Sequence, residues 1–333
     1  MVKRVAALAL AAGLALALPA RAEDTEVAFA LPTVSFAFAP IYIADAEQMW
    51  AKARLEVKFN LLIGVNSLNA VLSRSVDFSI SAAPAVIRAH VRGQKAIMIA
   101  NTFDGLVTEV TLRKDLAHAA GITEDSPIEK RAAALKGKKI AVQGLNSIVH
   151  GYMRMLAKKG GLNPERDFTI TPMASEASLA ALKSNQIDAI GDVLPWPEIA
   201  VHSGAAIMLS SGLRGDFPEL LPFNLNGITT QPDHCDKVPT VCQAIVDVYG
   251  QGMTFLREHP REARAILAKR FTGLEPAAFD EAFAIISKWT AKSTRIGEGG
   301  LHHAQELMVQ SGMIKEDERL ASFTELYTNK FTR

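Results

Sequence analysis

Between residues 27 and 100, short runs of β-forming apolar residues alternate with longer stretches of helical periodicity. A strand, a helix and a second strand in succession are typical of the parallel β-α-β unit, so this alternation predicts an α/β fold. The predicted strands are 27–31, 55–62, 78–80 and 96–100, and the predicted helices are 39–53, 67–73 and 84–92.

The same alternation starts again after residue 105 and predicts a second α/β unit, with strands at 106–112, 140–142, 168–173, 188–191 and 206–210. From residue 226 the pattern changes to one strand-like crossing followed mainly by helices. A chain of 333 residues is long enough for two domains of ordinary size. We expect a first lobe at 23–112, a second lobe at 113–224, and a return of residues 225–333 to the first lobe.

The N-terminus has the three parts of a secretory signal peptide. Lys3 and Arg4 precede an apolar run at 5–20, and small residues, Ala20 and Ala22, occupy the positions that a signal peptidase reads. The apolar run is shorter than the roughly 20 residues that span a membrane. We therefore expect cleavage after Ala22 and a soluble periplasmic protein.

The charge balance argues against a nucleic-acid partner. Without the three basic residues of the signal peptide, 33 Lys and Arg residues stand against 35 Asp and Glu residues. Binding to phosphate backbones requires a concentrated basic surface, which this composition does not favour.

The only two cysteines, Cys235 and Cys242, lie close together in the sequence. In an oxidising compartment such a pair favours one disulfide over two free thiols. His234 adjoins Cys235, but the ligand spacing of a zinc site is missing, so we predict neither a metal site nor a cofactor.

Six segments, in order along the chain, form a recognisable series: Ala39-Pro40-Ile41-Tyr42-Ile43-Ala44, Asp77-Phe78-Ser79-Ile80-Ser81, 135–142 (LKGKKIAV), 156–162 (LAKKGGL), 181–189 (ALKSNQIDA) and Pro195-Trp196. Together these segments resemble the nitrate/sulfonate/taurine-type substrate-binding proteins of ABC transporters, a group that overlaps the pyrimidine-synthase-like superfamily.

This resemblance implies the type II periplasmic binding fold, in which two lobes are joined by crossing strands and the ligand binds between them. It implies a monomer that captures a small organic molecule, such as a sulfonate, a carboxylate or an aromatic or pyrimidine-like compound, and delivers it to the permease of an ABC importer. A sensor that reports the ligand to a membrane receptor is an alternative that the sequence does not separate from transport.

Ligands of open α/β sheets bind beyond the carboxyl ends of the strands, which singles out particular loops. Two of these loops, 64–67 and 144–147, carry Asn and Ser at predicted helix N-termini, where free N–H groups attract anions. Ordinary helix capping uses the same residues, so both interpretations stay open. The predicted ligand-binding residues are Ser35, Phe36, Phe38, Asn66, Ser67, Ser81, Ala82, Thr102, Asn146, Ser147, His150, Glu176, Asp192 and Trp196.

The aromatic candidates, with Phe38 and Trp196 foremost, would supply apolar walls, although each could instead pack in the core. His150 follows Ser147 by one helical turn and could face the cleft or serve only the structure. Because no candidate loop carries Arg, the sequence favours a neutral or singly charged ligand.

Catalysis is the main rival to binding, since related folds include pyrimidine synthases. Their cysteine-rich motif is absent, and segment 144–151 lacks the glycine spacing of a nucleophile elbow. The sequence therefore predicts a binding protein and no enzyme.

Overall fold

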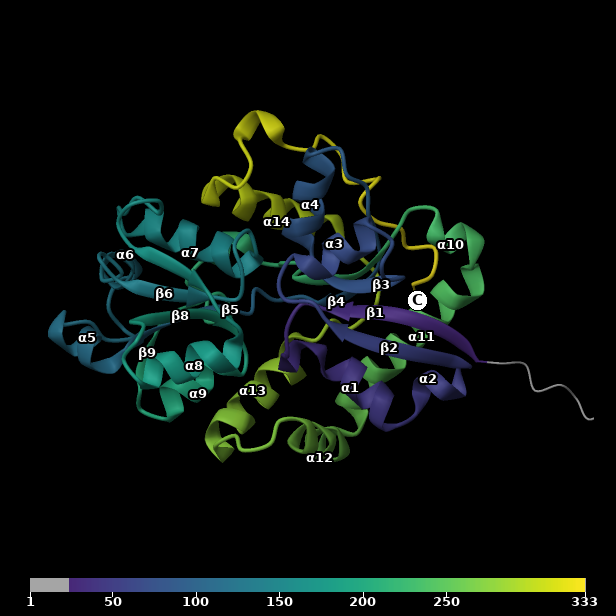
Figure 1. Ribbon diagram of the computed structural model, residues 1–333, viewed down its shortest axis with the longest axis horizontal. Coiled ribbons are helices and arrows are strands. Elements are labelled where there is room, and N and C mark those ends of the chain that lie inside the picture. The colour runs from purple at the N-terminus through teal and green to yellow at the C-terminus, as the bar shows by residue number, and fades with distance from the viewer. Residues whose placement is uncertain (1–23, 333) are drawn as a thin grey trace, which may run out of the picture.

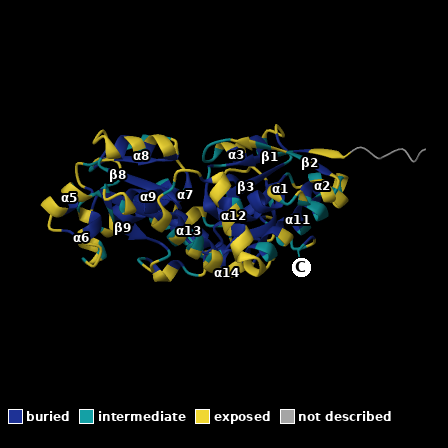
Figure 2. Ribbon diagram, turned by 90° about the horizontal axis from the view of Figure 1, so that it is seen from below, coloured by how far each residue is buried: buried dark blue, intermediate teal, exposed yellow. Residues whose placement is uncertain are grey.

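The computed structural model describes residues 24–332, so the predicted signal peptide at 1–22 lies outside the described residues. Two five-stranded sheets lie side by side, each flanked by helices (Figure 1). Their strand orders are β2-β1-β3-β10-β4 and β7-β6-β8-β5-β9. The strands are mostly buried, whereas exposed residues lie mainly on the outer faces of the helices (Figure 2). This arrangement confirms the predicted α/β fold with two lobes.

The first sheet contains four strands from the N-terminal part of the chain and one that returns much later. β1 (Thr25–Leu31) pairs in parallel with β2 (Leu55–Leu61) and β3 (Phe78–Ala82), whereas β10 (Asn226–Thr230) lies antiparallel between β3 and β4 (Ile97–Phe103).

The helices that connect these strands are α1 (Ala39–Ala46), α2 (Met49–Lys52), α3 (Asn66–Leu72) and α4 (Ala83–Val91), with a short 3-10 turn, η1 (Phe36–Phe38), before α1. The prediction of a single helix at 39–53 is wrong. Gln48 adopts a left-handed conformation, with φ at 56°, and divides that segment into α1 and α2.

The second sheet is built from β5 (Thr108–Arg113), β6 (Lys139–Val142), β7 (Thr169–Pro172), β8 (Ala189–Val193) and β9 (Ala206–Ser211). β6 runs parallel to β7 and β8, and β5 runs antiparallel to β8 and β9. The chain therefore passes from the first sheet to the second before Thr108, and residue 112, where we expected the boundary, lies inside a strand of the second sheet.

Five helices accompany the second sheet: α5 (Lys114–Ala119), α6 (Ile128–Ala133), α7 (Ile148–Lys159), α8 (Ser175–Lys183) and α9 (Trp196–His202). A 3-10 turn, η2 (Pro218–Leu220), precedes the return to β10.

The C-terminal part contains α10 (His234–Lys237), α11 (Pro239–Glu258), α12 (Pro260–Arg270), α13 (Pro276–Trp289), α14 (Glu298–Ser311) and the 3-10 turn η3 (Glu316–Glu318). α11 packs on α1 so closely that a Cβ at Gly252 would lie 2.4 Å from the Pro40 carbonyl oxygen. α13 packs against α9, and α14 packs against both α4 and α7. The helical tail thus joins the two lobes, whereas the sequence suggested only a cover for the first.

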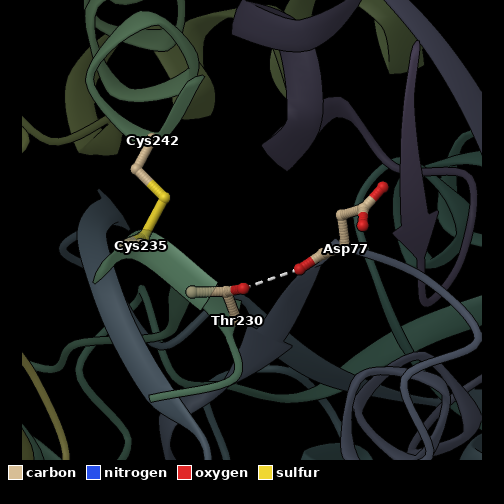
Figure 3. Close-up of a disulfide and its surroundings, with 4 residues drawn as sticks. All are labelled: Asp77, Thr230, Cys235 and Cys242. Carbon is tan, nitrogen blue, oxygen red and sulfur yellow. Dashed lines mark hydrogen bonds between the residues drawn. A yellow bond between two sulfur atoms is a disulfide. The ribbon is translucent and has the colours of Figure 1, made fainter. Parts of the chain in front are cut away.

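A disulfide between Cys235 and Cys242 links α10 to α11. It lies close to the point where β10 leaves the first sheet, where the Thr230 hydroxyl donates to the Asp77 carbonyl oxygen at 2.7 Å (Figure 3). The disulfide therefore holds the first two helices of the tail together, beside the end of β10.

Within residues 24–332, no helix combines the length and the apolar character needed to cross a membrane.

Candidate functional site

A cavity lies between the two sheets, at the edge where the carboxyl ends of β1, β3, β6 and β8 meet. We call it the inter-sheet cavity. Its volume is about 50 Å³ when measured as the space open to the centre of a water molecule, and about 560 Å³ when all space between atoms and the open mouth are included. Most of the wall is apolar, and of the described residues that line it, none is Asp, Glu, Lys, Arg or His. It is lined by Pro32, Thr33, Ser35, Ala37, Phe38, Gly64, Val65, Ser67, Leu68, Ser81, Ala82, Ala85, Val107, Gln143, Ser147, Ile148, Val193, Leu225 and Asn226.

The structure brings part of the predicted site together around this cavity. Residues from both lobes are included, as the rule on strand carboxyl ends predicts. The predicted residues that line the cavity are Ser35, Phe38, Ser67, Ser81, Ala82 and Ser147.

The aromatic candidates Phe36 and Trp196 lie elsewhere. Phe36 is fully buried, with its ring centre 4.3 Å from that of Phe271 and 5.1 Å from that of Phe279. Trp196 packs with α13, and its indole N–H donates to the Val34 carbonyl oxygen at 3.0 Å. Phe36 therefore packs against the helical tail, and Trp196 connects the two lobes. Phe38 is the aromatic candidate that lines the cavity.

Three further candidates support the loops without lining the cavity. The backbone N–H of Asn146 donates to the Nδ1 atom of His150 at 2.9 Å, so His150 stabilises the turn before α7. Burial lowers the pKa of His150, and the neutral ring is the form that can accept this bond. The Thr102 hydroxyl donates to the Asn226 carbonyl oxygen at 2.9 Å and holds that lining residue in place.

Asn66 and Glu176 are solvent-exposed and outside the cavity. The last candidate, Asp192, is only 1% exposed and lies directly behind the lining residue Gln143.

Three of the four serine hydroxyls that line the cavity already use their protons within the protein, and the fourth, Ser81, shares a hydrogen bond with the Ser79 hydroxyl at 2.7 Å. Ser35 donates to the Leu194 carbonyl oxygen at 2.8 Å, Ser67 to that of Gly64 at 3.0 Å, and Ser147 to that of Gly144 at 2.7 Å. A hydroxyl has one proton to donate, so these serines shape the loops more than they offer donors to a ligand.

Three polar lining residues were not among those that the sequence singled out: Thr33, Gln143 and Asn226. Thr33 and Gln143 follow parallel strands and could have been found by the same rule. Asn226 begins the antiparallel strand β10, so its amino end, and not its carboxyl end, lies at this edge. No sequence signal indicates that orientation.

Several hydrogen bonds join the loop at residues 33–35 to the second lobe across one side of the cavity. The Gln143 amide donates to the Thr33 hydroxyl at 3.3 Å, and the bonds from Ser35 to Leu194 and from Trp196 to Val34 lie beside it. Across the mouth, a Cβ at Gly64 would lie 3.9 Å from the Cα of Gly144. The two lobes are therefore in contact around the cavity.

Two buried glutamates lie away from the cavity, where β5 meets α9. Glu109 is 2% exposed and Glu198 is 1% exposed. Burial raises the pKa of each side chain, and the facing carboxylate raises that of Glu198 further. Among the described residues, no cluster of three or more His, Cys, Asp or Glu side chains is arranged to hold a metal ion.

The two sheets, with the inter-sheet cavity between them, form the two-lobed fold of periplasmic binding proteins. A family model described as NMT1/THI5 like matches residues 35–263. The chain belongs to this NMT1/THI5-like family, which confirms the superfamily resemblance seen in the sequence.

Similar solved structures share the fold at low sequence identity. The alkanesulfonate-binding protein SsuA from Xanthomonas axonopodis pv. citri, bound to MOPS, is 18% identical with a TM-score of 0.69, covering 89% of this chain and 96% of that one. The periplasmic aliphatic sulphonate binding protein SsuA from Escherichia coli is 18% identical with a TM-score of 0.63, covering 88% and 94%. The periplasmic nitrate-binding protein NrtA from Synechocystis PCC 6803 is 16% identical with a TM-score of 0.66, covering 93% and 87%. No curated protein matches the chain.

Proposed function

We propose that the protein is an exported, monomeric solute-binding protein that captures a small organic molecule in the inter-sheet cavity and delivers it to an ABC importer. The observation that carries this proposal is the lining of the cavity by residues of both lobes. A ligand bound there contacts both lobes at once, so its binding energy can stabilise one relative arrangement of the lobes. That arrangement is what a permease would recognise.

The chemistry of the wall narrows the class of ligand. Apolar side chains such as Phe38, Leu68 and Leu225 form most of the cavity wall, and its polar side chains carry amides and hydroxyls. A doubly charged anion would lack a cationic partner among the lining residues. The wall therefore suits a neutral or singly charged molecule with an apolar or aromatic body.

Binding can be tested by thermal unfolding of the mature chain with a panel of sulfonates, carboxylates, nitrate, primary amides and pyrimidines. A ligand at 100 times its Kd raises stability by about 2.7 kcal/mol. The variant Ala85→Trp should abolish the response, because Ala85 lines the cavity and the larger ring would fill it. Ala119→Trp is the matched control, since Ala119 is exposed at the end of α5.

A response that persists in Ala85→Trp would place the ligand elsewhere. A panel that gives no response, before and after unfolding and refolding to remove any bound ligand, would contradict the binding role. Export is tested separately by N-terminal sequencing of the protein from the periplasm, which should begin at Glu23. Delivery is tested by ligand uptake into vesicles that contain the candidate permease, with and without the protein.

A further inference from the structure

Gln143, at the end of β6, has a side-chain amide with both hydrogens committed. Its Nε2 donates to the Asp192 carboxylate at 2.5 Å and to the Thr33 hydroxyl at 3.3 Å. The carbonyl oxygen of the same amide receives no hydrogen bond from any residue within 24–332, although Gln143 lines the cavity. The group that Gln143 leaves for a ligand is therefore an acceptor.

Asp192 determines which end of the amide faces the ligand. The ionised carboxylate is an acceptor only, and it is held in place because its Oδ1 also accepts the Val193 backbone N–H at 2.8 Å. A rotated Gln143 amide would place its carbonyl oxygen against the carboxylate oxygen, with no proton between two electronegative atoms. At 1% exposure, water cannot relieve that repulsion.

We propose that Asp192 sets the ligand preference of the inter-sheet cavity by fixing Gln143 with its carbonyl oxygen toward the ligand. The site then requires a hydrogen-bond donor, an N–H or O–H group, and rejects a bare oxyanion at that position. This inference rests on the proposed binding function and specifies its ligand class. Asp192 acts as a positioning residue, since it does not line the cavity itself.

Three of the serine hydroxyls at the cavity are consistent with this preference. Ser35, Ser67 and Ser147 already donate to backbone carbonyl oxygens, so they add little to the hydrogen-bond donors that an oxyanion needs. The Ser81 hydroxyl shares a hydrogen bond with Ser79 at 2.7 Å, and the Thr33 hydroxyl, which accepts from Gln143, lies 3.5 Å from that of Ser175. The side-chain amide of Asn226 lines the cavity and can both donate and accept. A neutral molecule that carries an N–H or O–H donor as well as an acceptor would satisfy both amides.

The preference should depend on pH. Burial is the largest influence on Asp192 and raises its pKa to about 7, and the negative charge of Glu176 on α8 acts in the same direction. Hydrogen bonds to the carboxylate from Val193, Ser175 and Gln143 act in the opposite direction. Below this pKa the protonated carboxyl can donate to the Gln143 oxygen, which permits the amide to rotate and offer N–H to the ligand.

The test uses matched pairs that differ in the donor: benzamide with benzoate, butyramide with butyrate, and methanesulfonamide with methanesulfonate. Calorimetric titration at pH 8.5 should show at least tenfold tighter binding of the amide member. Asp192→Ala removes the acceptor that fixes the Gln143 amide, so both orientations of the amide become available and the preference should fall at least tenfold. Asp192→Asn keeps an acceptor oxygen on the Val193 N–H and should retain the preference at pH 8.5. Asp104→Ala is the matched control, because Asp104 accepts from the Asn101 amide at 2.6 Å and neither residue lines the cavity.

A second measurement needs no ligand. The side-chain amide resonances of Gln143 in ¹⁵N-labelled protein should titrate with a midpoint near pH 7, and the titration should disappear in Asp192→Asn. Tighter binding of the anionic members by the wild type would overturn the inference and leave the binding function standing. If no probe binds but the Gln143 resonances titrate in the wild type and not in Asp192→Asn, the positioning role holds and the proposed ligand class fails. If the Gln143 resonances do not titrate, or titrate equally in both proteins, the positioning role is overturned.

Discussion

Asp192→Asn should also make the protein more stable at neutral and alkaline pH. The Asp192 side chain is buried, and burial raises its pKa to about 7, whereas an unperturbed aspartate has a pKa near 3.9. The difference of about 3 units corresponds to about 4 kcal/mol, at about 1.4 kcal/mol per unit. This figure is an upper bound, because Asn offers one acceptor oxygen where the carboxylate has two.

The sign follows from proton binding. Between about pH 4 and pH 7 the folded protein keeps the Asp192 proton that the unfolded chain has lost. The free energy of unfolding therefore falls as pH rises through this window, and this contribution is constant above it. Asparagine does not titrate, so the variant should gain up to about 4 kcal/mol relative to the wild type between pH 4 and pH 8.

Thermal unfolding of both proteins across this pH range measures the effect, because the difference between them cancels the titration of all other groups. At about 2 °C per kcal/mol for a chain of this size, the gap in Tm should widen by up to about 8 °C. Asp115→Asn is a suitable control, since Asp115 is exposed and its hydrogen bond to Arg113 lowers its pKa. A gap in Tm that stays constant with pH would refute the reasoning.

Three further perturbations test other parts of the structure. Glu198→Gln removes one of two facing buried carboxyls whose pKa values are raised, so the Tm of the variant minus that of the wild type should be larger at pH 8 than at pH 5. The same difference in Tm at pH 5 and pH 8 would contradict the pairing with Glu109. Trp196→Phe leaves the Val34 carbonyl oxygen without its donor and should lower stability by about 1–3 kcal/mol in thermal unfolding, whereas an unchanged Tm would show that the bond between the lobes contributes nothing. Replacing both cysteines by alanine opens a short loop and should lower the free energy of unfolding by about 2–3 kcal/mol in the chain-entropy model. Thermal unfolding of this variant and of the reduced wild type should show the same loss.

The sequence by itself predicted the α/β architecture, the superfamily and several of the loops that line the inter-sheet cavity. Each depends on local information. Alternating periodicity reports which faces of an element are buried, and the loop rule depends only on where each parallel strand ends. Ser35, Phe38 and Ser147 were therefore correctly expected beside one another, although they come from different lobes.

Other features needed contacts between distant segments. β5 belongs to the second sheet because it pairs with β8 and β9, and those strands lie about 80 to 100 residues further along the chain. α13 and α14 join the lobes because of the helices they meet in space, which their own periodicity does not reveal.

Only the tertiary structure decided what the site offers a ligand. The sequence shows serines as possible donors, but whether a hydroxyl is free depends on the backbone carbonyl oxygen that the fold places beside it, as Leu194 lies beside Ser35. Gln143 and Asp192 are separated by 49 residues, and their contact at the ends of neighbouring strands converts an amide that could donate or accept into a fixed acceptor. Side-chain identity is local, but hydrogen-bond capacity depends on which partners the folded chain has already supplied.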